Sequence, residues 1–377
     1  MRSEPGSGCR GAAAATWLLG GSLLLTACGG GDTAPNAGTP AAASATFAAL
    51  PAMAGYAALV PHAISGDGNT VAGVAQNADG AAQAFRWSSD AGMTGLGYMA
   101  GGRRSEANAL SFDGTVAAGT GDAAGSQPTS SAAFRWTAGR GMQQLPPVTG
   151  GLACAGAGVS GDGEVVVGTC LAAGNTGFRW TQGDGSVGLP RSGGGTGASS
   201  MAVGISRDGT TAVGGGNPLL AGAMLWQGVQ PLVIGKLRPA DPSAQATAVS
   251  RDGSVVVGVS TDAAGVTWPF RWTASGGMAA LLDPPGPVRG IVPAAVSGDG
   301  VVVVGWGAGE GSETAMIRDS RRGMRPLVDA LQQDYRLDLA GWALRRASGV
   351  SDDGRVITGH GTDPAGATRG WIVRLQP

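Results

Sequence analysis

The segment Ser250-Arg251-Asp252-Gly253-Ser254-Val255-Val256-Val257-Gly258 decides the fold, because its pattern S-x-D-G-x-x-x-x-G occurs seven times along the chain. The Ser of each copy is found at Ser65, Ser111, Ser160, Ser206, Ser250, Ser297 and Ser351. The spacings of 46, 49, 46, 44, 47 and 54 residues are typical of the repeats of a β-propeller. Asp-Gly suits a tight turn, since Asp tolerates left-handed backbone angles and Gly adopts them freely. We therefore expect one tight turn at the same place in every repeat.

Each repeat contains four short apolar runs separated by turn residues. In the fifth repeat these runs are 246–249, 255–257, 270–272 and 278–282, and they are predicted to be four strands of one sheet. Large residues two apart in the third run share one face of the strand, and they should pack on the neighbouring sheet. Seven such units predict an all-β fold, a seven-bladed β-propeller with four-stranded blades.

The two ends of the repeat region complete one another. The last repeat stops at 371–375 without a fourth strand, while Leu50 precedes Ser65 by 15 residues, as Leu96 precedes Ser111. We expect 46–50 to pair with the C-terminal strand, so that the N-terminal and C-terminal strands close the ring. The propeller domain is therefore predicted over 46–377.

The N-terminal residues predict an export signal. Arg2 and Arg10 lead into a mostly apolar run at 12–25, and small residues follow it. This order is typical of a signal peptide. The run is shorter than the ~20 residues that a membrane-spanning helix needs. We predict a signal peptide over 1–27 rather than a permanent transmembrane helix.

The segment that ends this signal resembles the bacterial lipobox. It reads Leu25-Thr26-Ala27-Cys28-Gly29, and in a lipobox the Cys is acylated and becomes the mature N-terminus. Ordinary cleavage near Ala27 with a free thiol is the alternative. Residues 28–45 are therefore predicted to be a lipidated Cys followed by a flexible tether, because the residues after Cys28 are small or polar and include no aromatic residue. By analogy with such lipoproteins, Gly29 favours an exported protein anchored in the outer membrane, on its periplasmic or its cell-surface side.

Three features resemble the HAF repeats of bacterial extracellular proteins. They are the A-F-R-W strands, the S-x-D-G turns, and the G-M-x-x-L strands, which begin at Gly92, Gly141, Gly277 and Gly323. The resemblance covers 46–375, but Gln83 and Ala132 stand where the family has a His before Ala-Phe. The resemblance implies export and surface display, and it supplies no common catalytic site.

Composition and motifs exclude several classes of function. A net charge of -1 with 14% charged residues leaves no basic stripe for phosphates, so nucleic acid is not expected as a partner. The sequence contains neither G-x-S-x-G nor a G-K-[ST] phosphate-binding loop. The S-x-D-G phrase is similar to the Asp-box of sialidases, S-x-D-x-G-x-x-W, but is one residue shorter and lacks the Trp. We assign no catalytic residues.

Metal ligands and cofactors are not expected either. One Asp per turn around a ring does not form the six-to-eight-oxygen cage of a calcium site. Ring closure could bring His62 near His360, but zinc usually has three or four ligands and Asp363 is the one nearby third candidate. We interpret the two His as isolated polar residues at the rim.

Cys154 and Cys170 flank the turn at Asp162 symmetrically, eight residues on either side. This symmetry would place them opposite one another in a hairpin. An exported protein favours a cross-strand disulfide there, with two buried thiols as the alternative.

Variable links between blades are the expected site of recognition. These links, and the links between the second and third strands, open on the face opposite the S-x-D-G turns, which we call the link face. The candidates for contact with a ligand there are Tyr98, Arg103, Arg104, Arg191, Lys236, Arg238, Trp268, Arg289, Trp306 and Glu310. The longest link, 327–346, has Leu327, Leu331 and Tyr335 at helical spacing, which predicts a short helix over the rim.

These observations predict a monomeric binding scaffold at the bacterial cell envelope that is not an enzyme. It would be attached to the membrane through acylated Cys28 and would bind a protein or a polysaccharide. The alternative is a carbohydrate-active enzyme of the glycosidase or lyase type with its site in the central funnel. Such an enzyme should gather acids with Arg or Tyr at the ring axis, whereas Ala, Ser, Val and Gly dominate the predicted inner strands.

Overall fold

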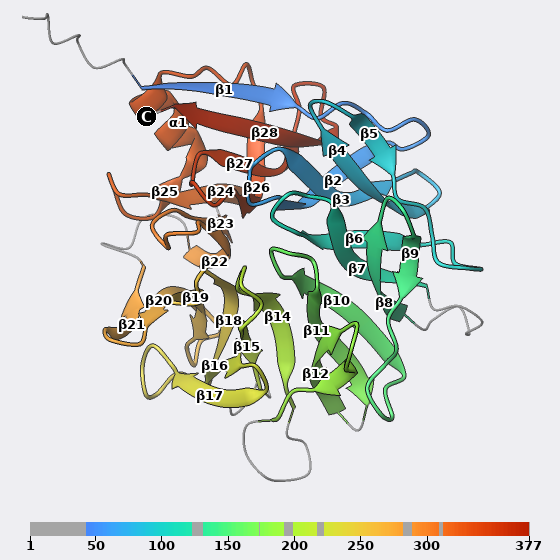
Figure 1. Ribbon diagram of the computed structural model, residues 1–377. Helices are drawn as coiled ribbons and strands as arrows, with labels where there is room; N and C mark the ends of the chain where they lie inside the picture. The colour runs from blue at the N-terminus through green and yellow to red at the C-terminus, as the bar shows by residue number, and fades with distance from the viewer. Residues whose placement is uncertain are drawn as a thin grey trace, which may run out of the picture. The chain divides into compact units, whose positions relative to one another are not determined.

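The computed structural model describes residues 43–122, 131–172, 174–191, 199–216, 222–281, 289–308 and 312–376. Its strands form seven four-stranded antiparallel sheets. The sheets follow one another around a ring, in chain order (Figure 1). The predicted all-β, seven-bladed propeller is thereby confirmed. The predicted signal peptide, Cys28 and most of the tether lie outside the described residues.

In blades 1 to 6 the strands run in chain order from the axis outward. Blade 1 contains β2 (Ala58–Ile64), β3 (Thr70–Gln76), β4 (Ala82–Ser88) and β5 (Gly92–Gly95). Blade 2 contains β6 (Ser105–Leu110), β7 (Val116–Asp122), β8 (Ser131–Thr137) and β9 (Gly141–Gln144). Blade 3 contains β10 (Ala153–Val159), β11 (Val165–Ala172), β12 (Gly174–Thr181) and β13 (Gly185–Gly188). Blade 4 contains β14 (Met201–Ile205), β15 (Thr211–Gly215), β16 (Ala223–Gln227) and β17 (Gln230–Gly235).

The last three blades complete the ring. Blade 5 contains β18 (Ser243–Val249), β19 (Val255–Thr261), β20 (Thr267–Thr273) and β21 (Gly277–Ala280). Blade 6 contains β22 (Arg289–Val296), β23 (Val303–Ala308), β24 (Glu313–Arg318) and β25 (Arg325–Pro326), and α1 (Leu327–Tyr335) follows it. Blade 7 contains β26 (Ala343–Val350), β27 (Val356–Thr362), β28 (Thr368–Gln376) and the N-terminal β1 (Ser44–Ala49).

The N-terminal strand closes the ring as predicted. β1 pairs antiparallel with β28, with Phe47 opposite Val373, and the two strands lie side by side in Figure 1. The strand begins at Ser44, two residues earlier than expected, and ends before Leu50. The inner strands of the first and last blades are also joined, because the Ser348 hydroxyl donates a hydrogen bond to the Pro61 carbonyl over 2.7 Å.

The repeated motif forms one hydrogen-bonded turn in every blade. In blade 5 the Ser250 hydroxyl donates to the Asp252 carboxylate over 2.9 Å and accepts the Val255 N–H over 2.9 Å. The same carboxylate oxygen accepts the Ser254 N–H, and Gly253 has a φ of 75°. The positive φ of Gly253 therefore favours Gly at this position, and the Asp252 carboxylate serves the turn by accepting these hydrogen bonds.

Neighbouring blades are locked together at these turns. In blades 1 and 2 the Arg of the F-R-W strand reaches the next turn, where Arg86 Nε donates to Gly114 O over 2.8 Å and Arg135 Nε to Gly163 O over 2.7 Å. The Arg thus binds the Gly carbonyl of the next blade rather than the Asp of the motif. The large residues that open this strand are fully buried between the sheets: Phe85, Phe134, Phe178, Met224, Phe270, Met316 and Trp371.

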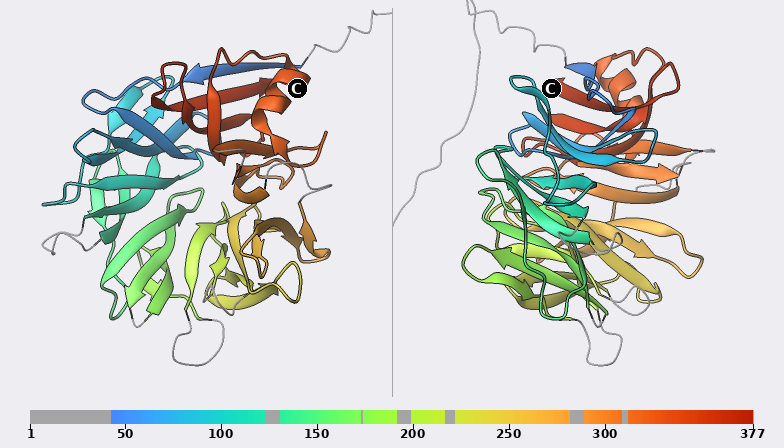
Figure 2. Two further views of the ribbon diagram at one scale, coloured as in Figure 1. Left: turned by 180° about the vertical axis from the view of Figure 1, so that it is seen from behind. Right: turned by 90° about the vertical axis from the view of Figure 1, so that its right-hand side faces the viewer.

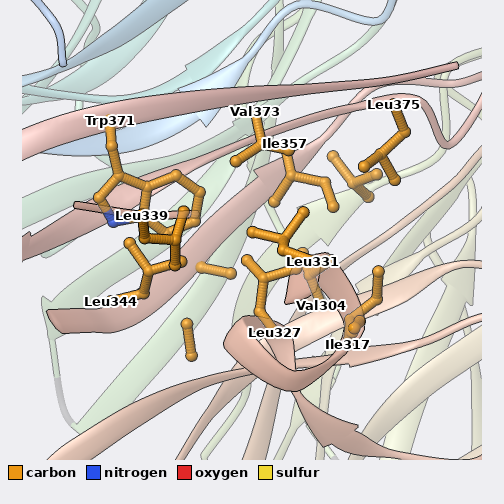
Figure 3. Packing of buried hydrophobic residues seen from close by; sticks show 14 residues of the cluster. Val304, Ile317, Leu327, Leu331, Leu339, Leu344, Ile357, Trp371, Val373 and Leu375 are labelled. Atoms are coloured by element: carbon orange, nitrogen blue, oxygen red, sulfur yellow. The ribbon is translucent and has the colours of Figure 1, made fainter. Parts of the chain in front are cut away.

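The predicted helix is confirmed as α1. Its Leu327 and Leu331 are fully buried, and they pack with Leu344 of β26 and Trp371 of β28 (Figure 3). Seen from behind, the helix lies beside the C-terminal strands (Figure 2). It therefore covers the apolar junction between blades 6 and 7. No helix among the described residues is long and apolar enough to cross a membrane.

Cys154 of β10 and Cys170 of β11 stand opposite one another in the ladder and form a disulfide. Both side chains are buried in the core of blade 3. The bond therefore ties the innermost strand of this blade to the second strand.

Candidate functional site

A β-bulge occurs at the same position in every inner strand. The pairing register shifts by one residue in β2, β6, β10, β14, β18, β22 and β26. A bulge leaves one residue unpaired and re-aims its side chain. The skipped residues stand three positions before each motif Ser, and they are His62, Asn108, Ala157, Val203, Thr247, Ala294 and Ser348. All seven line one cavity of about 240 Å³ at the ring axis, so we call them the bulge ring.

An apolar collar lies below the bulge ring, toward the S-x-D-G face. Its residues immediately precede each motif Ser, and they are Ile64, Leu110, Val159, Ile205, Val249, Val296 and Val350. The collar also lines a smaller cavity of about 130 Å³ beyond it. The collar side chains cannot form hydrogen bonds with a ligand, whereas polar residues of the bulge ring such as His62, Asn108 and Thr247 can.

Three side chains from different blades bridge the axis beyond the collar. Arg207 of blade 4 pairs with Asp352 of blade 7 over 2.5 Å. The Arg207 guanidinium also lies 3.1 Å above the ring centroid of Phe112, which comes from blade 2. This bridge narrows the channel at the end that carries the motif turns.

A larger cavity, which we call the axial pocket, lies above the bulge ring toward the link face. Its volume is about 320 Å³. Its polar wall consists of His62, Gln245, Thr247, Arg346, Ser348 and His360. Its apolar wall consists of Val60, Pro61, Val203, Val292, Pro293, Ala294 and Trp306. The pocket therefore combines an apolar surface with hydrogen-bonding groups.

An ion pair between blades 6 and 7 orders the mouth of this pocket. Arg346 donates to both carboxylate oxygens of Glu313, with Nε to Oε2 at 2.5 Å. These hydrogen bonds and the positive charge of Arg346 hold the pKa of the Glu313 carboxyl below its ordinary value. The guanidinium also lies 4.6 Å from the ring centroid of Trp306. The Trp306 indole thus packs against the Arg346 guanidinium, whose position is fixed by its two hydrogen bonds to Glu313.

His360 is a neutral side chain in this pocket. It pairs with Arg346 across the β26–β27 ladder. Burial lowers its pKa to about 4, and the charges of Arg346 and His62 act in the same direction while Glu313 opposes them. His62 comes from blade 1, and its Nδ1 lies 3.2 Å from Oε1 of Glu106, which comes from blade 2. The interpretation of the two His as isolated rim residues is therefore wrong, because the bulge in β2 and the ring closure bring both to one pocket.

The described residues contain no group of three or more His, Cys, Asp or Glu side chains placed to hold a metal ion. Asp363, the nearby third candidate named for the two His, accepts hydrogen bonds from the backbone N–H groups of Ala365 and Ala367. Its carboxylate therefore serves the β27–β28 turn.

Trp306 alone among the described ligand-face candidates lines the axial pocket. Three others gather at the edge of blade 5, where Arg238 lies 4.3 Å from the Trp268 ring and Lys236 Nζ donates to Asp241 O over 2.7 Å. Trp268 donates its indole N–H to Asp262 over 2.9 Å. These three form a local cluster away from the axis.

The remaining candidates are dispersed. Tyr98 is hydrogen-bonded to Tyr56 over 3.1 Å, which raises the pKa of Tyr56 to about 12. The backbone N–H groups of Arg103 and Arg104 bind the Asp122 carboxylate while both side chains are exposed, and Arg191 donates to Thr176 Oγ1 over 2.6 Å. The Arg289 side chain and Glu310 lie outside the described residues. The eight candidates whose side chains the structure describes therefore do not form one surface site.

The residues that do converge were detectable by their offset from the repeated motif. The positions three and five residues before the motif Ser include His62, Gln245 and Arg346, which line the axial pocket, and Glu106, which contacts His62. Sequence reasoning singled out His62 but missed Glu106, Gln245 and Arg346, because the bulge is not visible in a single copy of the repeat. Aligning all seven copies would have shown polar residues at two fixed offsets within otherwise apolar strands.

The chain is similar in fold to solved propellers, while no protein-family model and no curated protein sequence matches it. The β-propeller domain of the Trilobed protease from Pyrococcus furiosus, described as having an open velcro topology, superposes with a TM-score of 0.55 at 12% identity, over 84% of this chain and 95% of that one. Oligogalacturonate lyase from Vibrio parahaemolyticus gives 0.55 at 11% identity, over 88% and 97%. TolB from Acinetobacter baumannii gives 0.45 at 15% identity, over 69% of this chain and 64% of that one.

Identities this low show the shared fold alone. The resemblance to HAF repeats accordingly stays a prediction from the residues. The function has to be inferred from the axial pocket itself.

Proposed function

We propose that this protein is an exported, lipid-anchored β-propeller of the HAF-repeat type that binds a small ligand or the end of a polymer in its axial pocket at the cell envelope. The observation that carries the proposal is the pocket of about 320 Å³, which is lined by apolar residues together with polar side chains from three blades. Concave sites with this division of surface are the usual binding sites of proteins.

The protonation states of the pocket favour binding over acid catalysis. Glu313 is paired with Arg346, and its lowered pKa keeps it ionised, so it is a poor proton donor. His360, with a pKa near 4, is uncharged at neutral pH. A neutral imidazole next to an arginine does supply a base, which is the feature that favours the lyase-type alternative.

The disulfide supports an oxidising location. Cytosolic thiols are generally kept reduced, whereas disulfides persist in the periplasm and outside the cell. The predicted signal peptide and the acylated Cys28 would deliver the propeller to that side of the membrane. The tether, which ends before β1 at residue 43, would then let the axial pocket stand away from the bilayer.

A thermal-shift screen against envelope-derived saccharides and peptides tests the binding function. A ligand of the folded state raises Tm in proportion to RT ln(1 + [L]/Kd). We expect at least one compound to raise the Tm of the wild type and to lose this effect in Val203→Trp, which fills the pocket from β14. Val233→Trp, on the exposed outer strand of the same blade, is the matched control.

Three results would count against this proposal in different ways. Shifts that persist in Val203→Trp would place binding outside the axial pocket. A panel without any effect on the wild type would remove the binding function. Conversion of the bound compound to a product, detected by mass spectrometry and lost in His360→Gln, would replace the scaffold with the lyase-type alternative.

Membrane attachment is tested separately by labelling cells with a radioactive fatty acid. We expect label on the wild type and none on Cys28→Ser, which should leave the membrane fraction. Protease treatment of intact cells, and of cells with a permeabilised outer membrane, then distinguishes surface from periplasmic orientation. Label retained by Cys28→Ser would contradict the lipobox prediction.

A further inference from the structure

We infer that the axial pocket binds one or two rings of an uncharged saccharide. The inference rests on the proposed binding function and adds the chemical class of the ligand. It follows from the size of the pocket, from its combination of apolar and polar surface, and from its charge.

The two walls of the pocket match the two kinds of surface on a pyranose ring. A pyranose presents C–H groups on its faces and hydroxyl groups around its edge. Trp306, Pro293 and Val292 form an apolar surface on blade 6. Gln245 and Thr247 on blade 5 and Arg346 on blade 7 flank this surface on both sides. A ring lying on the indole would therefore place its hydroxyl groups within reach of the polar wall.

Trp306 is prepared for stacking before a ligand arrives. Its indole is partly exposed and lies against the Arg346 guanidinium at 4.6 Å, and that guanidinium is fixed by Glu313. Little side-chain entropy is then lost on binding, which is how a preorganised aromatic surface gains affinity. Aromatic side chains with an apolar face and a polar edge suit ligands of mixed polarity.

The polar wall retains hydrogen-bonding capacity. Arg346 uses Nε and Nη2 for Glu313, and no described residue accepts a hydrogen bond from its Nη1. The Gln245 side chain likewise makes no hydrogen bond to a described residue, and it can both donate and accept. Hydroxyl groups, which also donate and accept, are the natural partners for such a pair of side chains.

The charge of the pocket disfavours anionic saccharides. Arg346 is already neutralised by Glu313 in a bidentate pair. His360 is uncharged at neutral pH, and His62 faces the Glu106 carboxylate. A uronate carboxylate would therefore meet no unpaired cation at these positions, so no opposite charge would offset its desolvation.

The size of the pocket limits the ligand to a short unit. About 320 Å³ is near the lower end of the range of ligand pockets. The cavity of the bulge ring adds polar groups such as Asn108 beneath it, and the aliphatic collar then ends the polar surface. One or two sugar rings fit this depth, so a polymer would enter by its end.

Titration calorimetry with the full-length protein, in a detergent without a sugar headgroup, tests this inference. The neutral probes are cellobiose, maltose, lactose and chitobiose, and the acidic probe is digalacturonate. We expect at least one neutral disaccharide to bind and Trp306→Ala to weaken it by about tenfold or more. Trp268→Ala is the matched control, since Trp268 also lies beside an arginine on the link face but outside the pocket.

A second variant guards against misfolding of Trp306→Ala. Gln245→Leu keeps the side-chain size and removes the hydrogen-bonding amide, and it should also weaken binding by about tenfold. Binding of digalacturonate or peptides alone, abolished by Val203→Trp, would overturn the saccharide inference and keep the binding function. Binding of a neutral disaccharide that neither Trp306→Ala nor Gln245→Leu weakens would overturn the assignment of the pocket. If Val203→Trp weakened the binding of none of the probes, both the proposed binding function and the saccharide inference would be overturned.

Discussion

The motif Ser should be the most sensitive position of each turn, and Ser250→Ala tests this in blade 5. Ser250 is fully buried, and its hydroxyl both donates to Asp252 and accepts the Val255 N–H. Alanine would leave that buried N–H without a partner, which costs about 1–3 kcal/mol, and would remove one hydrogen bond to a carboxylate. We expect a total loss of about 2–4 kcal/mol in the free energy of unfolding.

Ser254→Ala is the matched control for this substitution. The Ser254 hydroxyl donates to the same Asp252 oxygen over 2.7 Å, but the residue is exposed and its hydroxyl satisfies no buried N–H. Water can replace this hydrogen bond, so we expect a loss below about 1 kcal/mol.

Urea unfolding followed by tryptophan fluorescence and circular dichroism measures both losses. Ser250→Ala should lower the midpoint without changing the slope m, because the same surface is exposed on unfolding. Equal losses for the two variants would refute the argument that the buried N–H is decisive. A loss below about 1 kcal/mol for Ser250→Ala would show that the turn is held by its backbone alone.

Three further predictions concern other parts of the molecule. Replacing Cys154 and Cys170 together by Ala should cost about 3 kcal/mol, from loop closure over a separation of 16 residues, and reduced wild type should show the same midpoint in urea. The pKa of His360 is about 4 in the folded protein, so between pH 6.5 and 4 this side chain is protonated in the unfolded chain but not in the folded one. The free energy of unfolding should therefore fall by about 3 kcal/mol as the pH drops from 6.5 to 4. His360→Gln should reduce this dependence of the free energy of unfolding on pH. Gly68→Ala should lower Tm more than Gly80→Ala, although both glycines have a positive φ. A Cβ at Gly68 would lie 2.7 Å from Val356 of blade 7, whereas a Cβ at Gly80 would have no atom within 4 Å. Equal decreases in Tm would contradict this argument.

The local pattern of the sequence was sufficient for the architecture. The motif spacing predicted the blade number, and the missing last strand predicted the pairing of β1 with β28. The blade number follows from turn residues that recur in each repeat. The pairing of the two ends follows from the edge that the last repeat leaves unpaired when its fourth strand is missing. The N-terminal strand was placed two residues late, because Ser44 and Ala45 are small residues that resemble the tether before them.

The candidate surface residues were a less successful prediction. Charged and aromatic residues in variable links were selected, but Arg238 and Trp268 pair with each other and Tyr98 pairs with Tyr56. Of that set, Trp306 reaches the axial pocket among the described residues. Sequence identifies which residues are able to bind, while their partners depend on how the links fold against the blades.

The seven blades, their repeated turn and the closure of the ring follow from the pattern of residues along the chain. The set of side chains that meet at the axis depends on the folded ring. Arg346 and Glu313 come from neighbouring blades, and Arg207 and Asp352 are 145 residues apart. Their convergence depends on the ring closure and on a one-residue bulge in each inner strand, which turns a side chain toward the axis. Such a bulge is a property of the pairing between two strands, so the residues of one strand do not specify it.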